Sequence, residues 1–440
     1  MLNRTDQKLS SRIVKNITVI SFCLLLALFF STPFFLMDTV LPTYMKIYRL
    51  YGYGLLFGLQ FLLLLCRGFE KSKLAFITPV IAVLAWFCIS VSWADHFDLS
   101  FRRVLLVFLI YFSVFSGVID LGYKKTLDIL RLFLVLVLTI NIFTVFAFPD
   151  IGIQSWHSYH LWRGLLADKN IAGVASAVTV IVFIIDGKRI ALYQRVLIIC
   201  AAFLFLYMSW SRTALIASAA ALAIGVLIPK IRHHIIHNSD FKRRFTDRYI
   251  WYTFAVSVLV LTYLTMQRDI VVSFTDNASG LSLRNSIWRP MIQYYLDHPI
   301  LGAGYGSYWD ASVNIESDTA YSTQKWLKNV DQGHNGYLDL LVQTGFFGLV
   351  LALWAAIAWP MTQFMTMVER QPDRAALTFS LLSFFMIENF TESSLFADDA
   401  LGNLFIFFAL AQVHRFKLRS GDQVRHRRDR SFDSREHSEK

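Results

Sequence analysis

The chain has 440 residues, of which 55% are hydrophobic and only 17% are charged, and 39 of them are phenylalanine. The apolar residues form long blocks, which excludes an ordinary soluble protein of two or three domains and indicates a single membrane domain. The net charge of +11 does not indicate a nucleic-acid partner, because the basic residues lie in short loops between these blocks.

The apolar blocks predict an all-α integral membrane protein. A helix that crosses a membrane needs about 20 predominantly apolar residues. By that rule the sequence predicts about twelve transmembrane helices, near residues 16–37, 50–66, 74–94, 104–121, 127–148, 170–186, 192–208, 213–229, 250–266, 337–358, 375–391 and 400–414.

The loop charges predict that both termini are cytoplasmic. In that orientation the cytoplasmic segments and their flanks hold 29 of the 42 lysines and arginines, the periplasmic segments hold 12, and Arg131 lies within a span. This asymmetry follows the positive-inside rule. The polytopic membrane domain then covers residues 1–417. The charged tail 418–440 is poor in aromatic residues and is expected to be disordered.

One periplasmic segment, at about 267–336, is much longer than the others. Its stretch Leu283–Leu296 predicts an amphipathic helix that ends at Asp297-His298-Pro299. A glycine-rich turn follows at 302–306. A large loop with short helices on one face of a membrane protein is where a functional site is expected.

The few periplasmic cations are candidates for an anion site. Arg212 stands at the outer start of a span, where it either anchors the helix at the lipid headgroups or binds a phosphate beside the helix N-terminus. Both interpretations stay open. Arg284 and Trp288 share a face of the loop helix, whereas Arg289 fits a solvated helix face better.

Two further periplasmic positions are ambiguous in the same way. Arg163, in Trp162-Arg163-Gly164, is either an anchor or an anion-binding group. Lys169 and Asn170, which begin the next span, are consistent with simple capping and anchoring, and equally with a place in a binding site.

His334 and Asn335 stand where the long loop meets the next span. The simpler interpretation is that Asn335-Gly336 makes a turn and that His334 is a helix-entry residue. The functional alternative is that His334 acts as a general base, because histidine titrates near neutral pH and can take a proton from a sugar hydroxyl. The neighbouring periplasmic arginines make that alternative plausible.

Several kinds of site have no sequence motif here. There is no G-x-x-x-x-G-K-[ST] phosphate loop, no H-E-x-x-H and no paired C-x-x-C. The sequence therefore indicates neither a nucleotide, nor zinc, nor another cofactor. Arginine could take the place of a metal ion in neutralising a pyrophosphate leaving group.

Three motifs together resemble the O-antigen ligase and polysaccharide polymerase superfamily of bacterial envelopes, over residues of about 160–350. The preceding loop, with Trp162-Arg163-Gly164 and Asp168-Lys169-Asn170, resembles that of the family as well. The three motifs are Ser-x-Ser-Arg-Thr-Ala at 209–214, Arg-x-x-x-Trp at 284–288 followed by His-Pro-Ile-Leu-Gly-Ala-Gly-Tyr-Gly at 298–306, and His-Asn-Gly-Tyr-Leu-Asp at 334–339 with Gly345 and Gly348 after it.

The resemblance implies metal-independent, inverting glycosyl transfer at the periplasmic face of the bacterial inner membrane. The donor would be a glycan on undecaprenyl pyrophosphate, which Arg212 and Arg284 would hold, with Arg163 as a further donor contact. His334 would activate the acceptor hydroxyl. The acceptor is either another lipid-linked repeat unit, for a polymerase of O-antigen, exopolysaccharide or capsule, or lipid A-core, for a ligase.

Polymerase is the modestly favoured interpretation, because His-Asn-Gly-Tyr-Leu-Asp is closer to exopolysaccharide-type polymerases. A chain-length regulator protein is a further possible partner. A polysaccharide transporter is the remote alternative. Carriers usually have ionisable residues at mid-membrane and repeated halves, and the sequence has few of the former and no match between halves.

Overall fold

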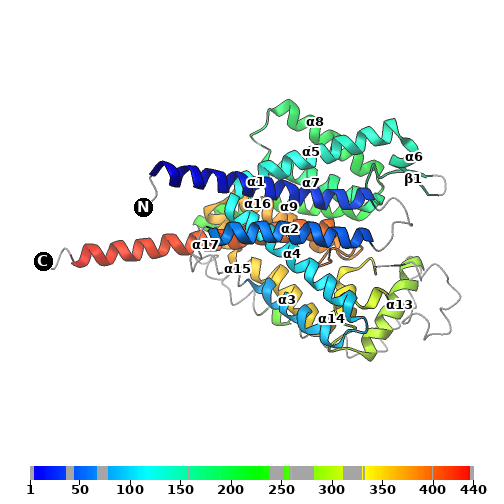
Figure 1. Cartoon of the computed structure of the whole chain (residues 1–440). Coiled ribbons are helices and arrows are strands. Elements are labelled where there is room, and N and C mark those ends of the chain that lie inside the picture. Colours follow the sequence, from blue (N-terminus) through cyan, green and yellow to red (C-terminus); the bar gives the residue numbers. More distant parts are fainter. Residues whose placement is uncertain are drawn as a thin grey trace.

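The protein is described here from a computed structural model, which is an all-α bundle with one small hairpin (Figure 1). The structure describes residues 4–35, 44–66, 78–156, 159–187, 189–237, 252, 254–256, 259, 282–310, 330, 332–398 and 400–436. Most of the predicted span 250–266 and half of the loop 267–336 lie outside this part of the chain.

Each of the other eleven predicted spans coincides with a helix of the described part, although several begin or end elsewhere than predicted. The helices that coincide with them are α1 (Arg4–Phe35), α2 (Tyr44–Cys66), α3 (Pro79–Ser90), α4 (Phe97–Leu121), α5 (Tyr123–Ala147), α7 (Lys169–Asp186), α8 (Leu192–Met208), α9 (Arg212–His237), α14 (Gly336–Leu353), α16 (Pro372–Glu388) and α17 (Leu401–Glu436).

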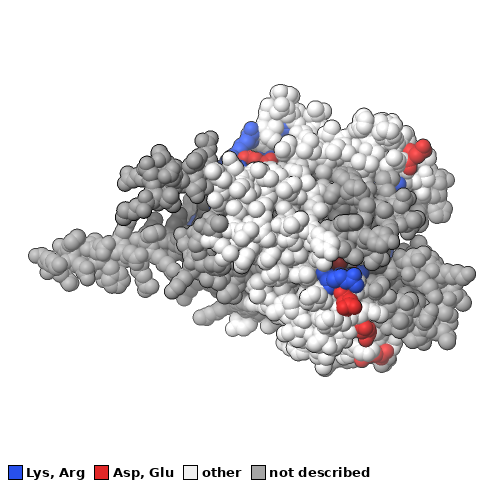
Figure 2. All heavy atoms as spheres, viewed as in Figure 1, with Lys and Arg blue, Asp and Glu red and all other residues white. Residues whose placement is uncertain are grey.

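Length and composition agree with a membrane protein. Five described helical segments are long and apolar enough to cross a membrane: Ile13–Phe30, Phe97–Leu121, Tyr123–Ala147, Lys169–Asp186 and Gly336–Arg370. Four shorter apolar helices, Leu50–Leu65, Pro79–Trp93, Leu192–Met208 and Arg212–Ile228, accompany them. Figure 2 shows charged side chains toward the two ends of the described surface, with a broad uncharged zone between them. The exact number of crossings stays a prediction.

The chain begins and ends on one side of the bundle. α1 starts and α17 finishes at the left of Figure 1, the arrangement expected for an even number of crossings. Which side of a membrane this is stays a prediction. The tail 418–440 was expected to be disordered, but α17 continues as a helix to Glu436. Arginine, glutamine and glutamate are good helix formers, and a helix already formed by the buried residues 401–416 propagates at little cost.

The connection from α14 is also more helical than the sequence predicts. The predicted span 337–358 and most of the predicted loop 359–374 form one helical segment, in which α14 passes through the π-helix η4 (Trp354–Ala358) into α15 (Trp359–Arg370). α15 has polar and apolar faces, so its polar residues do not interrupt the helix.

A short hairpin follows α5 where the sequence indicates only a loop. After the single turn α6 (Pro149–Gly152), strands β1 (Ile153–Trp156) and β2 (Tyr159–Trp162) pair antiparallel, with Ile153 opposite Trp162. Strands of four residues are too short to show a hydrophobic alternation, which explains why the sequence did not reveal them.

The glycine-rich turn packs on α14. Gly345 has a φ of 68° inside α14, and a Cβ there would lie 2.0 Å from the carbonyl oxygen of Ile300. The Phe346 amide donates to the carbonyl of Pro299, and the Ala303 amide donates to that of Val342. Only glycine permits this conformation and this close approach. The turn thereby connects α14 to the preceding helix α13 (Ser282–Asp297).

Candidate functional site

The site forms at one end of the bundle, where α7, α9 and α14 begin and α16 ends. We call this the outer end, after the predicted topology. The amphipathic helix predicted at 283–296 is present as α13, which packs against α14. The described part of the long loop therefore contributes a helix directly to the outer end.

His334 is held in a short, fixed entry to α14. Its φ of 48° lies in the left-handed region, which non-glycine residues seldom adopt outside constrained sites. Asn335 caps α14, because its side-chain oxygen accepts hydrogen bonds from the amides of Tyr337 and Leu338 at 3.2 and 3.1 Å. The cap fixes the direction in which the chain leaves His334.

Asp339, in the first turn of α14, also holds the segment that leads into this helix. Its buried carboxylate accepts hydrogen bonds from the Gly333 amide at 3.1 Å, from the Trp309 indole at 2.7 Å and from the Ser393 hydroxyl. Trp288 of α13 donates from its indole nitrogen to the carbonyl of Gly333 at 2.7 Å. The backbone next to His334 is thus held by two helices and by the loop that follows α16.

That last loop, residues 389–398, is itself well organised. The side chain of Asn389 accepts from the amides of Ser394 and Leu395 at 3.0 and 2.8 Å. The Gly336 amide donates to the carbonyls of Asn389 and Glu392. These bonds place the Glu392 side chain over the start of α14.

Three side chains from distant parts of the chain meet at Glu392. Its Oε1 accepts from Asn170 Nδ2 at 2.9 Å and lies 3.8 Å from Arg284 Nη2, and its Oε2 lies 3.3 Å from His334 Nδ1. Arg284 also donates to the carbonyl of Thr391 at 3.0 Å. We call Asn170, Arg284, His334 and Glu392 the Glu392 cluster.

The cluster determines how His334 titrates. The hydrogen bond with Glu392 raises the pKa of His334 above its usual value, and the charges of Glu392 and Asp168 act in the same direction. Burial and the nearby Arg284 guanidinium oppose this shift. An ionised carboxylate only accepts hydrogen bonds, so Nδ1 carries the proton in this pair. Nε2 of the neutral ring is then the nitrogen that can accept a proton.

Arg212 begins α9, which packs against α7, and within the described residues it makes no hydrogen bond or ion pair with the cluster. It is exposed at the first residue of α9, and its guanidinium stands 5.7 Å from the centre of the Trp210 ring. Ser211 packs against Gly173, one turn into α7, since a Cβ on Gly173 would lie 2.4 Å from Ser211 Cβ. The start of α9 therefore adjoins the helix that carries Asn170. Among the described residues, Arg212 forms no ion pair.

The remaining candidates have more structural contacts. Arg163 donates to the backbone carbonyls of Ile151 and Ala167, at 2.9 and 3.4 Å. These bonds hold the segment that follows strand β2. Lys169 is half-buried at the first position of α7, whose cap is Asp168, and Arg289 lies on the exposed side of α13. Trp288 and Asn335 contact the backbone around His334, as described above.

Glu392 and Asp339 are the site residues that the sequence candidates missed. Glu392 directly follows the predicted span 375–391, and Asp339 is the last residue of the motif at 334–339. One signal in the sequence could have identified Glu392. It is an acidic residue that directly follows a predicted span, on the same predicted side of the membrane as His334. Across the described residues, no three His, Cys, Asp or Glu side chains form a set that could hold a metal ion.

Comparison with known proteins identifies one family. Residues 174–353 match the model of a family described as O-antigen ligase. The matched segment includes Arg212, Arg284 and His334, while Asn170 and Glu392 lie outside it. A search of curated proteins finds no match to the chain. The family match supports membership of the O-antigen ligase superfamily, in agreement with the motifs.

Proposed function

We propose that this membrane protein of the O-antigen ligase superfamily transfers a glycan from undecaprenyl pyrophosphate to an acceptor hydroxyl at the periplasmic face of the inner membrane. The family match implies a ligase or polymerase type of glycan transfer. The observation that carries the finer proposal is the convergence of His334, Arg284 and Asn170 on Glu392.

His334 is the proposed general base. The acceptor oxygen forms a bond to the anomeric carbon of the donor while its proton passes to His334 Nε2. The bond between that carbon and the pyrophosphate oxygen breaks, and its electron pair leaves with the pyrophosphate. Attack from the face opposite the leaving group inverts the anomeric configuration. Glu392 holds Nδ1 and stabilises the imidazolium that forms, much as the acidic member of a catalytic triad does.

Arg284 and Arg212 are the proposed pyrophosphate contacts. The ion pair between Arg284 and Glu392 is long, at 3.8 Å, and Arg284 is 30% exposed. A partly exposed pair of this length is weak, so a pyrophosphate can compete for the guanidinium. Arg212 combines a fork of donors with the positive end of α9, which suits the same anion. The transfer would then need no metal, since these fixed cations neutralise the leaving group.

The other candidates are proposed as supporting groups. Asn170 would hold Glu392 in place, and Trp288 and Asn335 would position His334 through the backbone. Lys169, Arg163 and Arg289 line the approach as weaker donor contacts. Their contacts make them less direct candidates than Arg212 and Arg284.

Polymerisation of lipid-linked repeat units is the preferred reaction, and ligation to lipid A-core is the second candidate. The sequence around His334 favours the polymerase, whereas the description of the matched family names a ligase. Electrophoresis of lipopolysaccharide from a deletion strain separates them. A core without any glycan indicates a ligase, and a core with a single repeat unit indicates a polymerase. If the product is a secreted polymer, the lipopolysaccharide core does not change in the deletion strain. The size distribution of the polymer is then the quantity to measure.

The site assignment has a direct test. His334→Ala should abolish glycan assembly in the deletion strain at an unchanged level of protein in the membrane. His160→Ala is the matched control, because His160 is an exposed histidine of β2 outside the cluster, and it should restore assembly. Full activity of His334→Ala would refute the assignment.

A further inference from the structure

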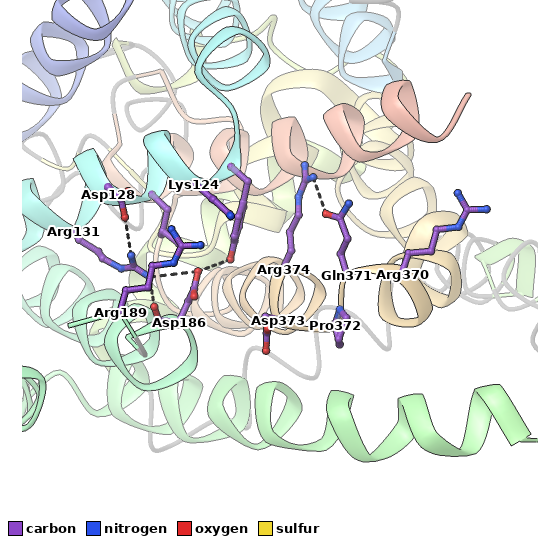
Figure 3. A pocket seen from close by; sticks show the side chains of 12 residues that line it. Lys124, Asp128, Arg131, Asp186, Arg189, Arg370, Gln371, Pro372, Asp373 and Arg374 are labelled. Atoms are coloured by element: carbon purple, nitrogen blue, oxygen red, sulfur yellow. Dashed lines mark hydrogen bonds and ion pairs between the residues drawn. The ribbon is translucent and has the colours of Figure 1, made fainter. Parts of the chain in front are cut away.

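A second polar site lies at the opposite end of the bundle, which we call the inner end. Here α7 ends, α5 and α16 begin, and a cavity of about 310 Å³ opens between them (Figure 3). Asn170 and Asp186 stand near the two ends of α7, so this cavity is about 24 Å from the Glu392 cluster along that helix. It is therefore separate from the glycan site proposed above. Five cations line it: Lys124, Arg131, Arg189, Arg370 and Arg374.

Three aspartates, Asp128, Asp186 and Asp373, also line the cavity. Asp128 and Asp186 are both paired with one of the five cations. Arg131 lies 2.9 Å from Asp128 and 3.3 Å from Asp186, and Asp186 also accepts the hydroxyl of Tyr123 at 2.7 Å. The side chain of Arg131 is only 7% exposed, and its Nε has no hydrogen-bond partner within the described structure. A buried guanidinium N–H of this kind calls for an acceptor.

Two other cations are left to attract an anion. Lys124 and Arg189 are exposed, and neither forms an ion pair with any residue that the structure describes. Figure 3 shows both side chains in the opening between α5 and α16, with Arg189 beside Arg131. Arg374 adds a further positive charge at the back, buried to 4% exposure, with its guanidinium 5.4 Å from the centre of the Tyr123 ring.

We propose that this cavity binds a phosphate-bearing anion, either the headgroup of an anionic lipid or free phosphate. Guanidinium groups offer planar N–H donors to phosphate oxygens, and Lys124 adds a point charge. The cavity lies at one end of the apolar segments Tyr123–Ala147 and Lys169–Asp186, which are long enough to cross a membrane. Lipid headgroups are expected at the ends of such segments. Basic pockets between transmembrane helices on the cytoplasmic side are a common form of headgroup site.

The topology signal of positively charged cytoplasmic loops does not by itself account for this arrangement. That signal requires only that lysines and arginines be present in the loops, in contact with water. Here Arg131 and Arg374 are buried, and α5, the segment after α7, the end of α15 and the start of α16 bring their cations around one cavity. Arg131 is paired with Asp128 and Asp186, whereas Lys124 and Arg189 form no ion pair within the described residues. An anion in the cavity would balance these two charges and stabilise the packing around it.

Thermal unfolding of the purified full chain in neutral detergent tests the proposal. Four additions are compared: cardiolipin, phosphatidylglycerol, phosphatidylcholine and inorganic phosphate. Cardiolipin or phosphatidylglycerol should raise the midpoint by about 3 °C or more, and phosphatidylcholine should not. A rise with inorganic phosphate alone identifies the same site as one for the free anion. No rise with any of the three anions would refute the proposal.

Variants assign the effect to the cavity. The double variant Lys124→Ala/Arg189→Gln should lose the rise, because it removes two exposed cations that have no described ion pair. Lys230→Ala removes an exposed lysine outside the cavity. This control variant should still show the rise in the unfolding midpoint. Mass spectrometry of the intact protein with bound cardiolipin, on the single variant Arg189→Gln, gives a second measurement if the double variant folds poorly. Equal binding by wild type and variants would overturn the proposal.

Discussion

The two ends of α7 and α16 carry opposite arrangements of charge. At the outer end the carboxylate of Glu392 is surrounded by an amide, an arginine and a histidine. At the inner end the carboxylates Asp128 and Asp186 are paired with Arg131, and Lys124 and Arg189 face the same cavity. At the outer end a central hydrogen-bond acceptor can orient a histidine base. At the inner end a cavity lined by hydrogen-bond donors can bind an anion.

This difference shows why counting charges does not locate a site. Five cations line the cavity at the inner end, but a high number of cations is also what the positive-inside rule expects of any predicted cytoplasmic loop. At the outer end an amide, an arginine and a histidine from three separate segments meet at the carboxylate of a fourth. Convergence from distant segments, more than charge density, therefore marks the outer end as the candidate for chemistry.

The largest expected effect is at His334. Replacing His334 with alanine should lower the rate of glycan transfer by about 10²- to 10⁴-fold, because a positioned base contributes that much. The measurement is polymer formed per unit time by the purified protein with a lipid-linked donor. His160→Ala should stay near the wild-type rate. A fall of less than twofold in His334→Ala would remove the outer end as the place of proton transfer.

Arg212 comes next. Arg212→Ala should lower transfer by about 10²-fold, since it removes donors to the charge that develops on the pyrophosphate. Arg212→Lys should recover only part of the rate, because lysine keeps the charge and loses the planar fork. Arg102→Ala, at an exposed arginine whose Nε donates only to its own helix, is the control. Equal rates for the alanine and lysine variants of Arg212 would argue against a bidentate contact.

The smallest effect is expected on stability. Asp339→Asn keeps the shape of the side chain but leaves fewer acceptors for Gly333, Trp309 and Ser393. It should lower the free energy of unfolding by about 1–3 kcal/mol, seen as a lower midpoint of thermal unfolding in detergent. Asp150→Asn, at an exposed aspartate, should leave the midpoint unchanged. An unchanged midpoint in Asp339→Asn would mean that this carboxylate does not hold the entry to α14.

Local signals in the sequence predicted much of the helical structure. Apolar blocks gave eleven of the helices, and the Asp297-His298-Pro299 stop and the Asn335 cap gave one end of α13 and of α14. The hairpin after α5 was missed, because four-residue strands show no clear alternation. The helical tail was missed because composition reports the average polarity of a segment and not its continuity with a buried helix.

The candidate site was predictable only in part. Arg284, His334 and Asn170 were recognised from motifs, each on its own segment. Their meeting point was not, because Glu392 is 222 residues from Asn170 in the chain and 58 from His334. Such a contact depends on the packing of α16 against α7 and on the fold of the last loop, and no local pattern encodes either one.

The pH dependence of glycan transfer by the wild type and by Glu392→Gln tests the central claim most directly. The base acts when neutral, so a raised pKa of His334 places the acid limb of the wild-type profile above the ordinary histidine value of 6.5. Glu392→Gln removes the charge that raises this pKa, so the rate should fall and the acid limb should move to lower pH. An acid limb at the same pH in both proteins would contradict the assignment of His334 and Glu392 as a working pair.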